Sequence, residues 1–551
     1  MCGIFTYIGN EKIDDDRDGN LSLQSNSISY RGPDLTSKVI VDDKIFMGFH
    51  RLSIMDMSAL GSQPMSHPFD DSITMVCNGE IYNYKELKEE YNIKTKSNSD
   101  CEVILHLYKI LPIKDMLKKL DGVFAFVLRD SSKGVTYAAR DPIGVRPLFY
   151  GSGSDSKGET YSFCSELKGI YKLSDNAKQF PPGCYWSSES PNKTSRFYSY
   201  TYRASKKSDE KEICSDIRNL LTNAVRKRLM SDREIGCLLS GGLDSSLIAS
   251  LVQRDMQKFS VGSRGVTGAT PRRIKTFSIG MPGSPDLMYA NKVARWIQSD
   301  HHEVLVEPKD FLDAIPEVIR RIESFDTTTV RASVGNYLVS KYISENTDCK
   351  VIFNGDGADE VCVGYVYNKD APTLQDLQKE SVRLVKELCY FDVLRSDRSI
   401  SSNGLEPRTP FLDISFVNYY MKIDPKFKSF NKKDLIEKRL LRKSFENEGL
   451  LPDSILWRDK CAFSDGVSST KNSWHKVVQQ HIESQITDEE FERESEKIKH
   501  CKPLLKESLY YRNIYRDIFG EGNFEIIPHF WMPRWTDAID PSARELSGYK
   551  E

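Results

Sequence analysis

The 551-residue sequence lacks the features of secreted, zinc-binding and membrane-spanning proteins. Its twelve cysteines include no C-x-x-C pair and no cluster with histidine at metal-ligand spacing, so we expect no zinc site and the reduced thiols of a cytoplasmic protein. No charged segment followed by an apolar run begins the chain, and no stretch approaches the roughly 18 apolar residues that a membrane span needs. We therefore expect neither a signal peptide nor a membrane partner.

A surplus of one charge is also absent. The 77 basic residues nearly balance the 79 acidic ones, and the net charge is −2. Because binding to nucleic acid draws on a basic surface, this balance disfavours a nucleic-acid partner. The chain has no internal repeat or low-complexity tract, and 39% hydrophobic with 28% charged residues is typical of globular enzymes. Its length predicts two large domains.

The first positive signal is Cys2. Removal of Met1 would leave Cys2 with a thiol and a free α-amino group on one residue. Their reference pKa values, about 8.5 and about 7.7 to 8.0, allow the neutral amine to take the thiol proton near neutral pH. Such a self-contained nucleophile and base indicates acyl transfer from an amide. The dipeptide alone is weak evidence, because a cysteine after the initiator methionine also arises by chance.

The first two hundred residues predict a β-rich domain. Short β-branched or aromatic runs are separated by Gly, Pro, Asp and Ser, and we expect strands at 3–9, 44–48, 73–77, 122–130, 135–139 and 161–164. Helices are expected at 86–91 and 101–111. Strands with helices laid over them indicate a layered α+β domain. The charged, Ser-rich segment 204–211 is expected to be a linker.

A different pattern follows the linker. Apolar residues at helical spacing over 213–229 precede an apolar run, 235–239, that predicts a buried parallel strand. Strand-like runs at 276–279, 303–306 and 351–353 then alternate with helical patterns at 289–297, 311–322 and 335–343. This alternation predicts a doubly wound α/β domain with its ligand site beyond the carboxyl ends of the strands. We expect 258–275, which has no periodicity, to form a surface loop.

The segment Ser240-Gly241-Gly242-Leu243-Asp244-Ser245-Ser246 follows the first of these strands and opens a helix. Its glycines let the backbone approach a phosphate, its hydroxyls and helix-terminal amides can bind one, and Asp244 can hold a divalent cation. The lysine of the ordinary G-x-x-x-x-G-K-[ST] loop is absent, which favours cleavage between the α- and β-phosphates over γ-phosphoryl transfer. A purely structural Gly-rich turn is the less favoured interpretation.

Further motifs follow in order along both halves of the chain. The first half contains Cys2-Gly3-Ile4, Arg31-Gly32-Pro33-Asp34, His50-Arg51-Leu52-Ser53-Ile54, Asn78-Gly79-Glu80-Ile81-Tyr82-Asn83, Ser99-Asp100 and 139–144. The second contains the 240–246 loop, 283–287, 329–333, Gly355-Asp356-Gly357-Ala358-Asp359-Glu360, Pro410-Phe411-Leu412-Asp413 and Phe463-Ser464-Asp465-Gly466. With these motifs the chain resembles the glutamine-dependent asparagine synthetases over essentially its whole length, and its C-terminal portion resembles the eukaryotic cytosolic members. The resemblance implies an N-terminal nucleophile glutaminase, or class II glutamine amidotransferase, at 1–205 and an ATP-pyrophosphatase-type synthetase domain at 206–551.

For the first domain, the resemblance implies that Cys2 attacks the side-chain amide of glutamine and releases ammonia. The Asn78 side chain and the Gly79 backbone N–H would form the oxyanion hole. Arg51 would bind the α-carboxylate of glutamine, while Glu80 and Asp100 would bind its α-ammonium, which suits a fork of donors and a pair of acceptors. The implied glutamine site comprises Arg51, Leu52, Ile54, Asn78, Gly79, Glu80 and Asp100.

For the second domain, the resemblance implies that ATP activates aspartate as β-aspartyl-AMP. Ammonia arriving through an internal tunnel would then form asparagine, with AMP and pyrophosphate released. Asp244 and Asp359 are the implied Mg²⁺ ligands, and Lys460 would neutralise charge as pyrophosphate departs. Arg331, Glu360 and Tyr365 are the implied contacts to aspartate or the adenylate. The implied ATP site comprises Leu238, Ser240, Gly241, Gly242, Leu243, Asp244, Ser245, Ser246, Ile279, Asn354 and Gly355. A homodimer is the default expectation for assembly.

The chain departs from the family pattern at one functional position. Where the family has Ser-Gly-Glu-Gly-Ser-Asp-Glu, this chain has 354–360, with Asp356 in place of the glutamate assigned to assist ammonia attack. The carboxylate is retracted by one methylene, roughly 1.5 Å, whereas a proton acceptor must lie within about 3.2 Å of its target. Val363 also replaces the first of two glycines found in bacterial members. We expect these changes to affect ammonia transfer rather than adenylation.

Three other functions are less compatible with the sequence. A β-lactam-forming relative would adenylate another carboxylate, but such relatives lose the glutaminase nucleophile, and Cys2 is retained. A thiolating or tRNA-modifying enzyme is disfavoured by the missing basic surface and paired thiols. A degenerate synthetase kept as a binding protein is disfavoured because Cys2, Asn78, Asp244 and Lys460 are all present.

Overall fold

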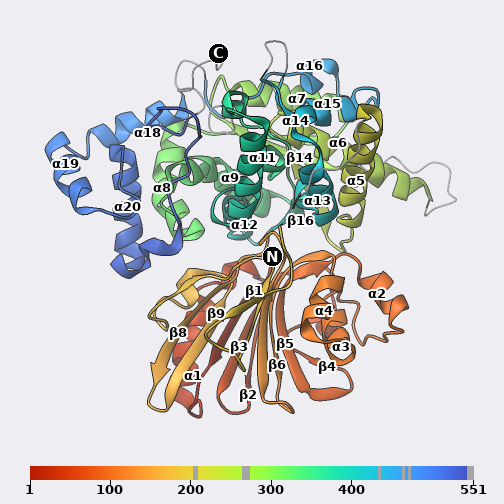
Figure 1. Cartoon of the computed structure of the whole chain (residues 1–551), viewed down its shortest axis with the longest axis vertical. Coiled ribbons are helices and arrows are strands. Elements are labelled where there is room, and N and C mark those ends of the chain that lie inside the picture. Colours follow the sequence, from red (N-terminus) through yellow and green to blue (C-terminus); the bar gives the residue numbers. More distant parts are fainter. Residues whose placement is uncertain are drawn as a thin grey trace.

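The computed structural model describes residues 1–200, 202, 209–262, 273–431, 436–461, 466–469 and 473–542, with the side chains of 259–262 excepted. Figure 1 shows two lobes, with the chain's first two hundred residues below, the rest above, and the N-terminus where the lobes meet. The domain boundary expected between 205 and 206 lies outside the described residues, as do most of the expected linker and Phe463-Ser464-Asp465. No helix of the described ranges is long and apolar enough to cross a membrane.

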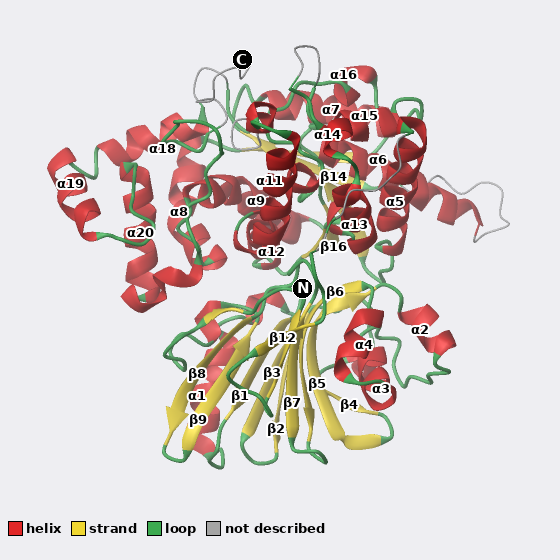
Figure 2. Ribbon diagram, viewed as in Figure 1, coloured by secondary structure: helices red, strands yellow, loops and turns green. Residues whose placement is uncertain are grey.

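The lower lobe is built on two antiparallel sheets of six strands, whose strands are yellow in Figure 2. The first sheet has the order β10 (Lys178–Gln179), β8 (Phe149–Asp155), β9 (Gly158–Cys164), β1 (Gly3–Ile8), β3 (Ile45–Arg51), β2 (Leu35–Val41). The second has the order β12 (Thr194–Arg196), β11 (Cys184–Ser187), β7 (Val135–Arg140), β6 (Gly122–Asp130), β5 (Asp70–Ile81), β4 (Met65–His67). The helices are α1 (Asp15–Asn26), α2 (Tyr84–Glu90), α3 (Glu102–Ile110) and α4 (Ile113–Lys119).

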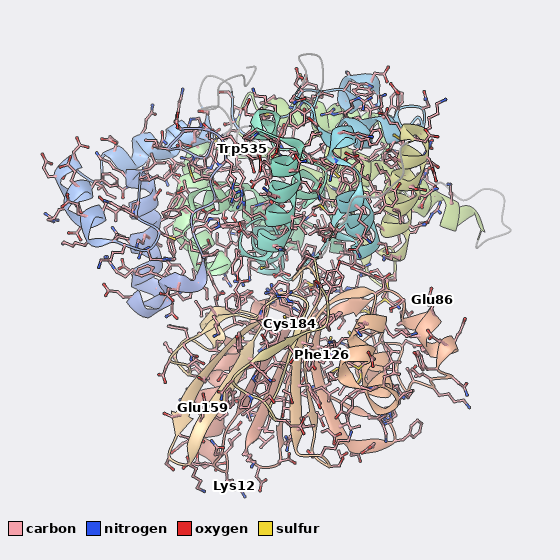
Figure 3. The ribbon with its side chains drawn as sticks, in the orientation of Figure 1. Lys12, Glu86, Phe126, Glu159, Cys184 and Trp535 are labelled. Atoms are coloured by element: carbon pink, nitrogen blue, oxygen red, sulfur yellow. The ribbon has the colours of Figure 1, made fainter. Side chains whose placement is uncertain are left out.

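The apolar side chains of this lobe form its layers. Ile4, Phe49 and Val127 belong to a cluster that both sheets share, as expected of sheets packed face to face. Phe126, labelled in Figure 3, belongs instead to the cluster that packs α3 and α4 on the outer face of the second sheet. The layered α+β domain is therefore confirmed. Helix α1 was not expected from the sequence, because 15–26 is rich in Asp, Asn and Ser and presents only a weak apolar stripe.

The upper lobe contains a five-stranded sheet whose paired strands are all parallel. Its order is β15 (Asp300–Leu305), β14 (Lys275–Gly280), β13 (Glu234–Leu238), β16 (Cys349–Phe353), β17 (Glu406–Arg408). The chain winds outward from β13 first to one side and then to the other. The strand order reverses beside β13, and ligands of such sheets bind at that switch, beyond the carboxyl ends of the strands.

Helices pack on both faces of this sheet, which confirms the doubly wound α/β domain. They are α5 (Glu210–Lys227), α6 (Leu243–Gly262), α7 (Pro285–Ile297), α8 (Pro308–Ile322), α9 (Thr327–Asn346), α10 (Ala358–Val361), α11 (Leu374–Glu387), α12 (Asp392–Ser401), α13 (Ile414–Lys422), α14 (Pro425–Lys428), α15 (Arg439–Phe445), α16 (Asp453–Leu456), α18 (Trp474–Glu483), α19 (Asp488–Lys497) and α20 (Lys506–Phe519). A surface loop was expected at 258–275, but its first residues are helical, because α6 continues to Gly262. Residues 263–272 lie outside the described ranges.

Buried charges join the two lobes. Arg31 of the lower lobe lies 2.6 Å from Glu166 and 2.9 Å from Asp397 of α12. Glu323, at the end of α8, contacts Lys168 at 3.2 Å and Arg398 at 2.6 Å. Each of these carboxylates faces a guanidinium or ammonium, as buried charges require. The lobes therefore meet through specific ion pairs that fix how the two halves are oriented.

Candidate active sites

A small cavity of about 40 Å³ lies at the top of the lower lobe. Its lining contains every residue expected to bind or attack glutamine, and it also contains Glu406 of the upper lobe. The expected residues are Cys2, Arg51, Leu52, Ile54, Asn78, Gly79, Glu80 and Asp100. Three strands deliver the central members, since Cys2 directly precedes β1, β3 ends at Arg51, and β5 carries 78–80. Strand pairing thus brings together residues that lie far apart in the sequence.

Gly79 is required by the neighbouring strand. A Cβ added there would lie 2.3 Å from the Val123 carbonyl oxygen and 2.6 Å from the Phe124 Cα of β6. Backbone atoms cannot yield to such a contact, so position 79 accepts no side chain. The residue can offer the cavity only its backbone, which is the group expected of it in an oxyanion hole.

The chain terminus is enclosed. Met1 is 1% exposed, its ammonium donates to the Leu405 carbonyl at 3.2 Å, and burial lowers the pKa of that ammonium to about 6. Cys2 Sγ lies 3.7 Å from the Leu52 carbonyl oxygen, and burial raises the pKa of the Cys2 thiol to about 11. With Met1 present, the thiol is therefore held in its neutral form. Removal of Met1 would place the α-amino group on Cys2 itself.

Polar groups around Cys2 are poised toward the cavity. Both polar side-chain atoms of Asn78 are buried without a hydrogen-bond partner, which is costly unless a ligand supplies one. Arg51 is fixed from behind, because its guanidinium donates to the backbone oxygens of Ser58, at 2.8 Å, and of Asp56. Burial raises the pKa of Asp100 to about 6, and burial together with nearby Glu406 raises that of Glu80 well above its ordinary value. Both carboxylates would gain from a cationic ligand.

A larger cavity of about 290 Å³ lies at the switch point of the upper sheet. Most expected nucleotide and adenylate residues line it: Leu238, Ser240, Gly242, Leu243, Asp244, Ser245, Ile279, Arg331, Asn354, Gly355, Asp356, Asp359, Glu360, Tyr365 and Lys460. Gly241 and Ser246 are outside this lining. Gly241 has φ +73°, and a Cβ there would lie 2.4 Å from the Ala290 backbone nitrogen. Gly241 thus lets the loop pass against α7 rather than facing the ligand.

The loop is held in an open cradle by its own hydroxyls. Ser245 Oγ accepts from the Ser240 backbone N–H at 3.1 Å, and the two hydroxyls lie 3.0 Å apart. Arg458, which also lines the cavity, supports the loop by donating to the Gly241 carbonyl at 3.0 Å and pairing with Asp286 at 3.2 Å. The amide groups at the start of α6 remain directed toward the cavity end of the sheet, where an anion is favoured.

The two expected cation ligands already share a lysine. Lys438 Nζ lies 2.5 Å from both Asp244 Oδ2 and Asp359 Oδ1, and Lys460 also pairs with Asp359. Burial lowers the pKa of Lys438, but the two carboxylates raise it further, so the ammonium stays charged. Paired carboxylates with one buried, unpartnered oxygen, Asp244 Oδ1, fit a divalent cation such as Mg²⁺.

Asp356 is paired with an arginine that the sequence analysis did not single out. Its Oδ1 lies 2.9 Å from Arg395, which also pairs with Asp392, whereas its Oδ2 is buried without a hydrogen-bond partner. Burial raises the pKa of Asp356, although Arg395 opposes that rise. Next to it, Tyr365 donates to Glu360 at 2.6 Å, and burial with nearby Asp392 raises the pKa of Glu360 well above its usual range.

Arg331 is fully engaged by two carboxylates. It pairs with Glu507 of α20 at 2.5 Å and with Asp540 at 2.8 Å, and its side chain is 3% exposed. Asp540 lies in the C-terminal segment, which also contributes Trp531, Pro541 and Ser542 to the cavity wall. Figure 3 labels Trp535 of the same segment, whose ring centroid is 6.0 Å from that of Tyr367. Arg331 therefore anchors the segment around Asp540 beside the cavity.

Several residues of these sites escaped the sequence analysis. Lys438, Arg395 and Glu406 lie in no short motif with a known chemistry, and only the fold brings them to the cavities. Arg458 could have been found, because it stands two residues before Lys460 in a segment already matched to the family. Arg408 could not, since its role depends on the fold, which brings it 3.7 Å from Glu80 of the other lobe.

The two cavities define a two-domain glutamine-dependent amidotransferase, with a terminal cysteine in one lobe and a phosphate cradle in the other. Comparison with known proteins gives the family. A profile described as "Glutamine amidotransferase domain" matches residues 1–225, and one described as "Asparagine synthase" matches 216–379 and 369–523.

Curated relatives named asparagine synthetase [glutamine-hydrolyzing] match the chain from end to end. Those of Gallus gallus and Rattus norvegicus are each 42% identical, and that of Homo sapiens is 40% identical; every match covers 100% of this chain and 99% of the relative. The chain belongs to the asparagine synthase family, with an N-terminal glutamine amidotransferase domain. The expected family, and the likeness to its eukaryotic members, are confirmed.

Proposed function

We propose that this protein makes asparagine from aspartate and glutamine, with ATP converted to AMP and pyrophosphate. The observation that carries the proposal is the pairing of two distinct cavities in one chain, each lined by the residues that its half-reaction needs. Full-length similarity to glutamine-hydrolysing asparagine synthetases supports the same reaction. All twelve cysteines are free, which supports a reducing, cytoplasmic setting.

In the first half-reaction, Cys2 attacks the side-chain carbonyl of glutamine after Met1 is removed. The new α-amino group takes the thiol proton and returns it to the leaving ammonia, and water then hydrolyses the glutamyl thioester to release glutamate and restore the Cys2 thiol. Asn78 and the Gly79 backbone stabilise the tetrahedral oxyanion, in keeping with the unpartnered Asn78 side chain. Arg51 binds the α-carboxylate, and Glu80 with Asp100 binds the α-ammonium, whose charge offsets the raised pKa values of both carboxyl groups.

In the second half-reaction, the β-carboxylate of aspartate attacks the α-phosphate of ATP in the upper cavity. The 240–246 cradle binds the phosphates, and Lys460 neutralises charge on the departing pyrophosphate. Asp244 and Asp359 would hold Mg²⁺, which supplies positive charge to the phosphates when bound. Glu360 and Tyr365 form a hydrogen-bonded pair on the cavity wall, and Arg331 pairs with Asp540 beside Pro541 and Ser542 of the same wall.

Ammonia must then travel between the cavities. Strand β17 supports such a path, because Glu406 lines the glutamine cavity while the Arg408 carbonyl accepts from the Asn354 backbone N–H of the upper cavity at 3.1 Å. Leu405, at the start of this segment, accepts the Met1 ammonium. Removal of Met1 would clear buried volume at the point where ammonia leaves Cys2. Asp356, with its unpartnered Oδ2, is the group we propose to assist ammonia attack.

A test of the reaction needs only the purified full-length chain. We expect asparagine, AMP and pyrophosphate in equal amounts from aspartate, ATP, Mg²⁺ and glutamine, and also with ammonia in place of glutamine. Omission of aspartate is the matched control, since it should abolish pyrophosphate release. An amide of another carboxylic acid would indicate a β-lactam-type relative, and ATP binding without any product would indicate a degenerate synthetase.

A further inference from the structure

A buried lysine occupies the position between the two proposed cation ligands. Lys438 Nζ is 2.5 Å from Asp244 Oδ2 and 2.5 Å from Asp359 Oδ1. The two carboxylates follow different strands, β13 and β16, so the ammonium joins two neighbouring strand ends. Lys438 is only 3% exposed, and charges removed from water interact more strongly than they do at a surface.

The surrounding backbone is shaped to place this ammonium. Lys438 has φ +55°, a left-handed conformation that is uncommon outside glycine and persists only where neighbouring structure enforces it. Arg442, one turn further along α15, holds the preceding peptide by donating to the Glu437 carbonyl at 2.9 Å. A Cβ on Gly364 would lie 2.1 Å from both Lys438 Cε and Asp359 Oδ1, so the lysine fits because residue 364 has no side chain.

An ammonium and a metal ion cannot share this position. Mg²⁺ binds carboxylate oxygens at about 2.0 to 2.1 Å. An ammonium 2.5 Å from both carboxylates stands in the way of a cation that bridges them, and the two like charges would repel each other. Cation binding therefore requires Lys438 to move. Phosphates bound by the 240–246 cradle in the same cavity would supply new partners of opposite charge, since the neighbouring Glu437 is already paired with Arg442.

We propose that Lys438 is a resident counter-cation of the synthetase site, which neutralises Asp244 and Asp359 in the metal-free protein and yields their oxygens to the divalent cation that enters with nucleotide. Lys438 then pairs with the phosphates. It is a positioning residue that pairs either with the two carboxylates or with the phosphates. The cation therefore binds tightly only when nucleotide is also bound. The inference rests on the proposed function, since that function assigns Asp244 and Asp359 to the cation.

The exchange predicts how the affinity for metal changes when the lysine is replaced. In wild type, a cation that arrives without nucleotide must displace Lys438 from two carboxylates and leave it with no new partner. In Lys438→Met, which keeps most of the aliphatic stem, Asp244 has lost its cationic partner and Asp359 keeps only Lys460. Mn²⁺ alone should then bind at least about tenfold more tightly than it binds wild type, because one opposing charge is gone.

Binding of Mn²⁺ to the metal-free full-length chain, followed by electron paramagnetic resonance, tests this expectation without any turnover. Wild type and Lys438→Met are titrated with Mn²⁺ alone and with Mn²⁺ plus ATP. Lys443→Met is the matched control, because Lys443 lies on α15, the helix that Lys438 precedes, but pairs with Glu210 at 2.7 Å. It should bind Mn²⁺ as wild type does. Thermal unfolding gives a second readout: Mn²⁺ should raise the midpoint of Lys438→Met well above its value in chelator, and change wild type little.

The outcomes separate the inference from the proposed function. Equal Mn²⁺ affinity of wild type and Lys438→Met, with tight binding when ATP is added, would overturn the counter-cation alone. Failure of wild type to bind Mn²⁺ even with ATP would overturn both. If Lys438→Met does not fold, Asp244→Asn and its double variant with Lys438→Met are compared, since the double variant buries less uncompensated charge. Tighter Mn²⁺ binding by the double variant is expected, and equality would refute the proposal.

Discussion

The two cavities differ in how their polar side chains are occupied before a substrate arrives. In the glutamine cavity, Asn78 has no hydrogen-bond partner, and two carboxyl groups, Glu80 and Asp100, have raised pKa values. In the nucleotide cavity, three carboxylates are already paired, with Lys438 between Asp244 and Asp359 and with Arg395 against Asp356, and Glu360 is the neighbour whose pKa stays well above its usual range. Polar groups of the glutamine cavity therefore lack partners before the substrate binds, whereas paired groups of the nucleotide cavity must exchange their partners when the ligands bind.

The difference follows from what each site must bind. A small zwitterion supplies one charge of each sign. A rigid pocket can hold the partners of these two charges in place before the zwitterion binds, and strand ends from two sheets provide that rigidity. A nucleotide with its cation brings several charges of both signs. Leaving their partners bare in a buried cavity would cost stability, and internal ion pairs avoid this cost until the ligands arrive. The comparison predicts opposite responses to mutation in the two lobes.

The largest expected effect separates the lobes outright. Cys2→Ala should lower glutamine hydrolysis by at least about 10³-fold, because the other thiols that line the cavity, Cys77 and Cys101, have no free α-amino group beside them to act as base. Ammonia-dependent asparagine synthesis should be unchanged, since the nucleotide cavity lies in the other lobe. Paired assays with glutamine and ammonia measure this, after intact mass has established that Met1 is absent from the mature chain. Retained glutaminase activity would remove Cys2 from its assigned role.

The converse variant is Asp244→Asn. It removes one negative charge from the proposed cation site and should slow adenylate formation by about 10³ to 10⁴, while glutaminase activity persists. Aspartate-dependent exchange of pyrophosphate into ATP reports this step. Asp255→Asn, on the same helix but paired with Arg226 outside the cavity, is a control for loss of an α6 carboxylate. Unchanged exchange in Asp244→Asn would make residue 244 a turn residue only.

Asp356 tests whether an already paired group can still act in catalysis. Asp356→Ala should slow amide formation by on the order of 10² to 10⁴, the range of general acid–base assistance, with much less effect on pyrophosphate exchange. Asp356→Glu should preserve or raise the rate, because it restores the reach of the family glutamate. The ratio of asparagine formed to pyrophosphate released is the measurement. If alanine leaves both the ratio and the rate unchanged, Glu360 becomes the next candidate.

Sequence patterns predicted what depends on local order. Both fold classes were predicted, and most of the expected site residues line the two cavities, since strands, turns and family motifs each span a few consecutive positions. The patterns did not predict Lys438 or Arg395, because their functions arise from side chains of distant segments that meet only in the fold. Helix α1 was missed for another reason: its polar sequence is held by packing on the sheet rather than by propensity.

The smallest expected effect is a change in the free energy of unfolding, and its sign differs between the two cavities. Burial raises the pKa of Asp100 to about 6, so the folded protein binds this proton more tightly than the unfolded chain, whose pKa is about 3.9. The charged carboxylate therefore destabilises the fold fully above about pH 6, and not below about pH 4. Asp100→Asn, which keeps an oxygen to accept from the Ile81 N–H, should stabilise the ligand-free protein by up to about 2 kcal/mol near neutral pH.

Asp359→Asn should do the reverse. Burial raises the pKa of Asp359, but Lys438 and Lys460 lower it further, to below its usual range. Its charge therefore contributes stability above the unfolded pKa, and this contribution is lost as pH falls through the folded value. Urea unfolding midpoints at about pH 7.5 and about pH 4.5 measure both variants, and the gain in Asp100→Asn should shrink at the lower pH. If both variants shifted stability in the same direction at the higher pH, the proposed difference between the glutamine cavity, whose carboxyl groups have raised pKa values, and the nucleotide cavity, whose proposed cation-binding carboxylates are paired, would be wrong.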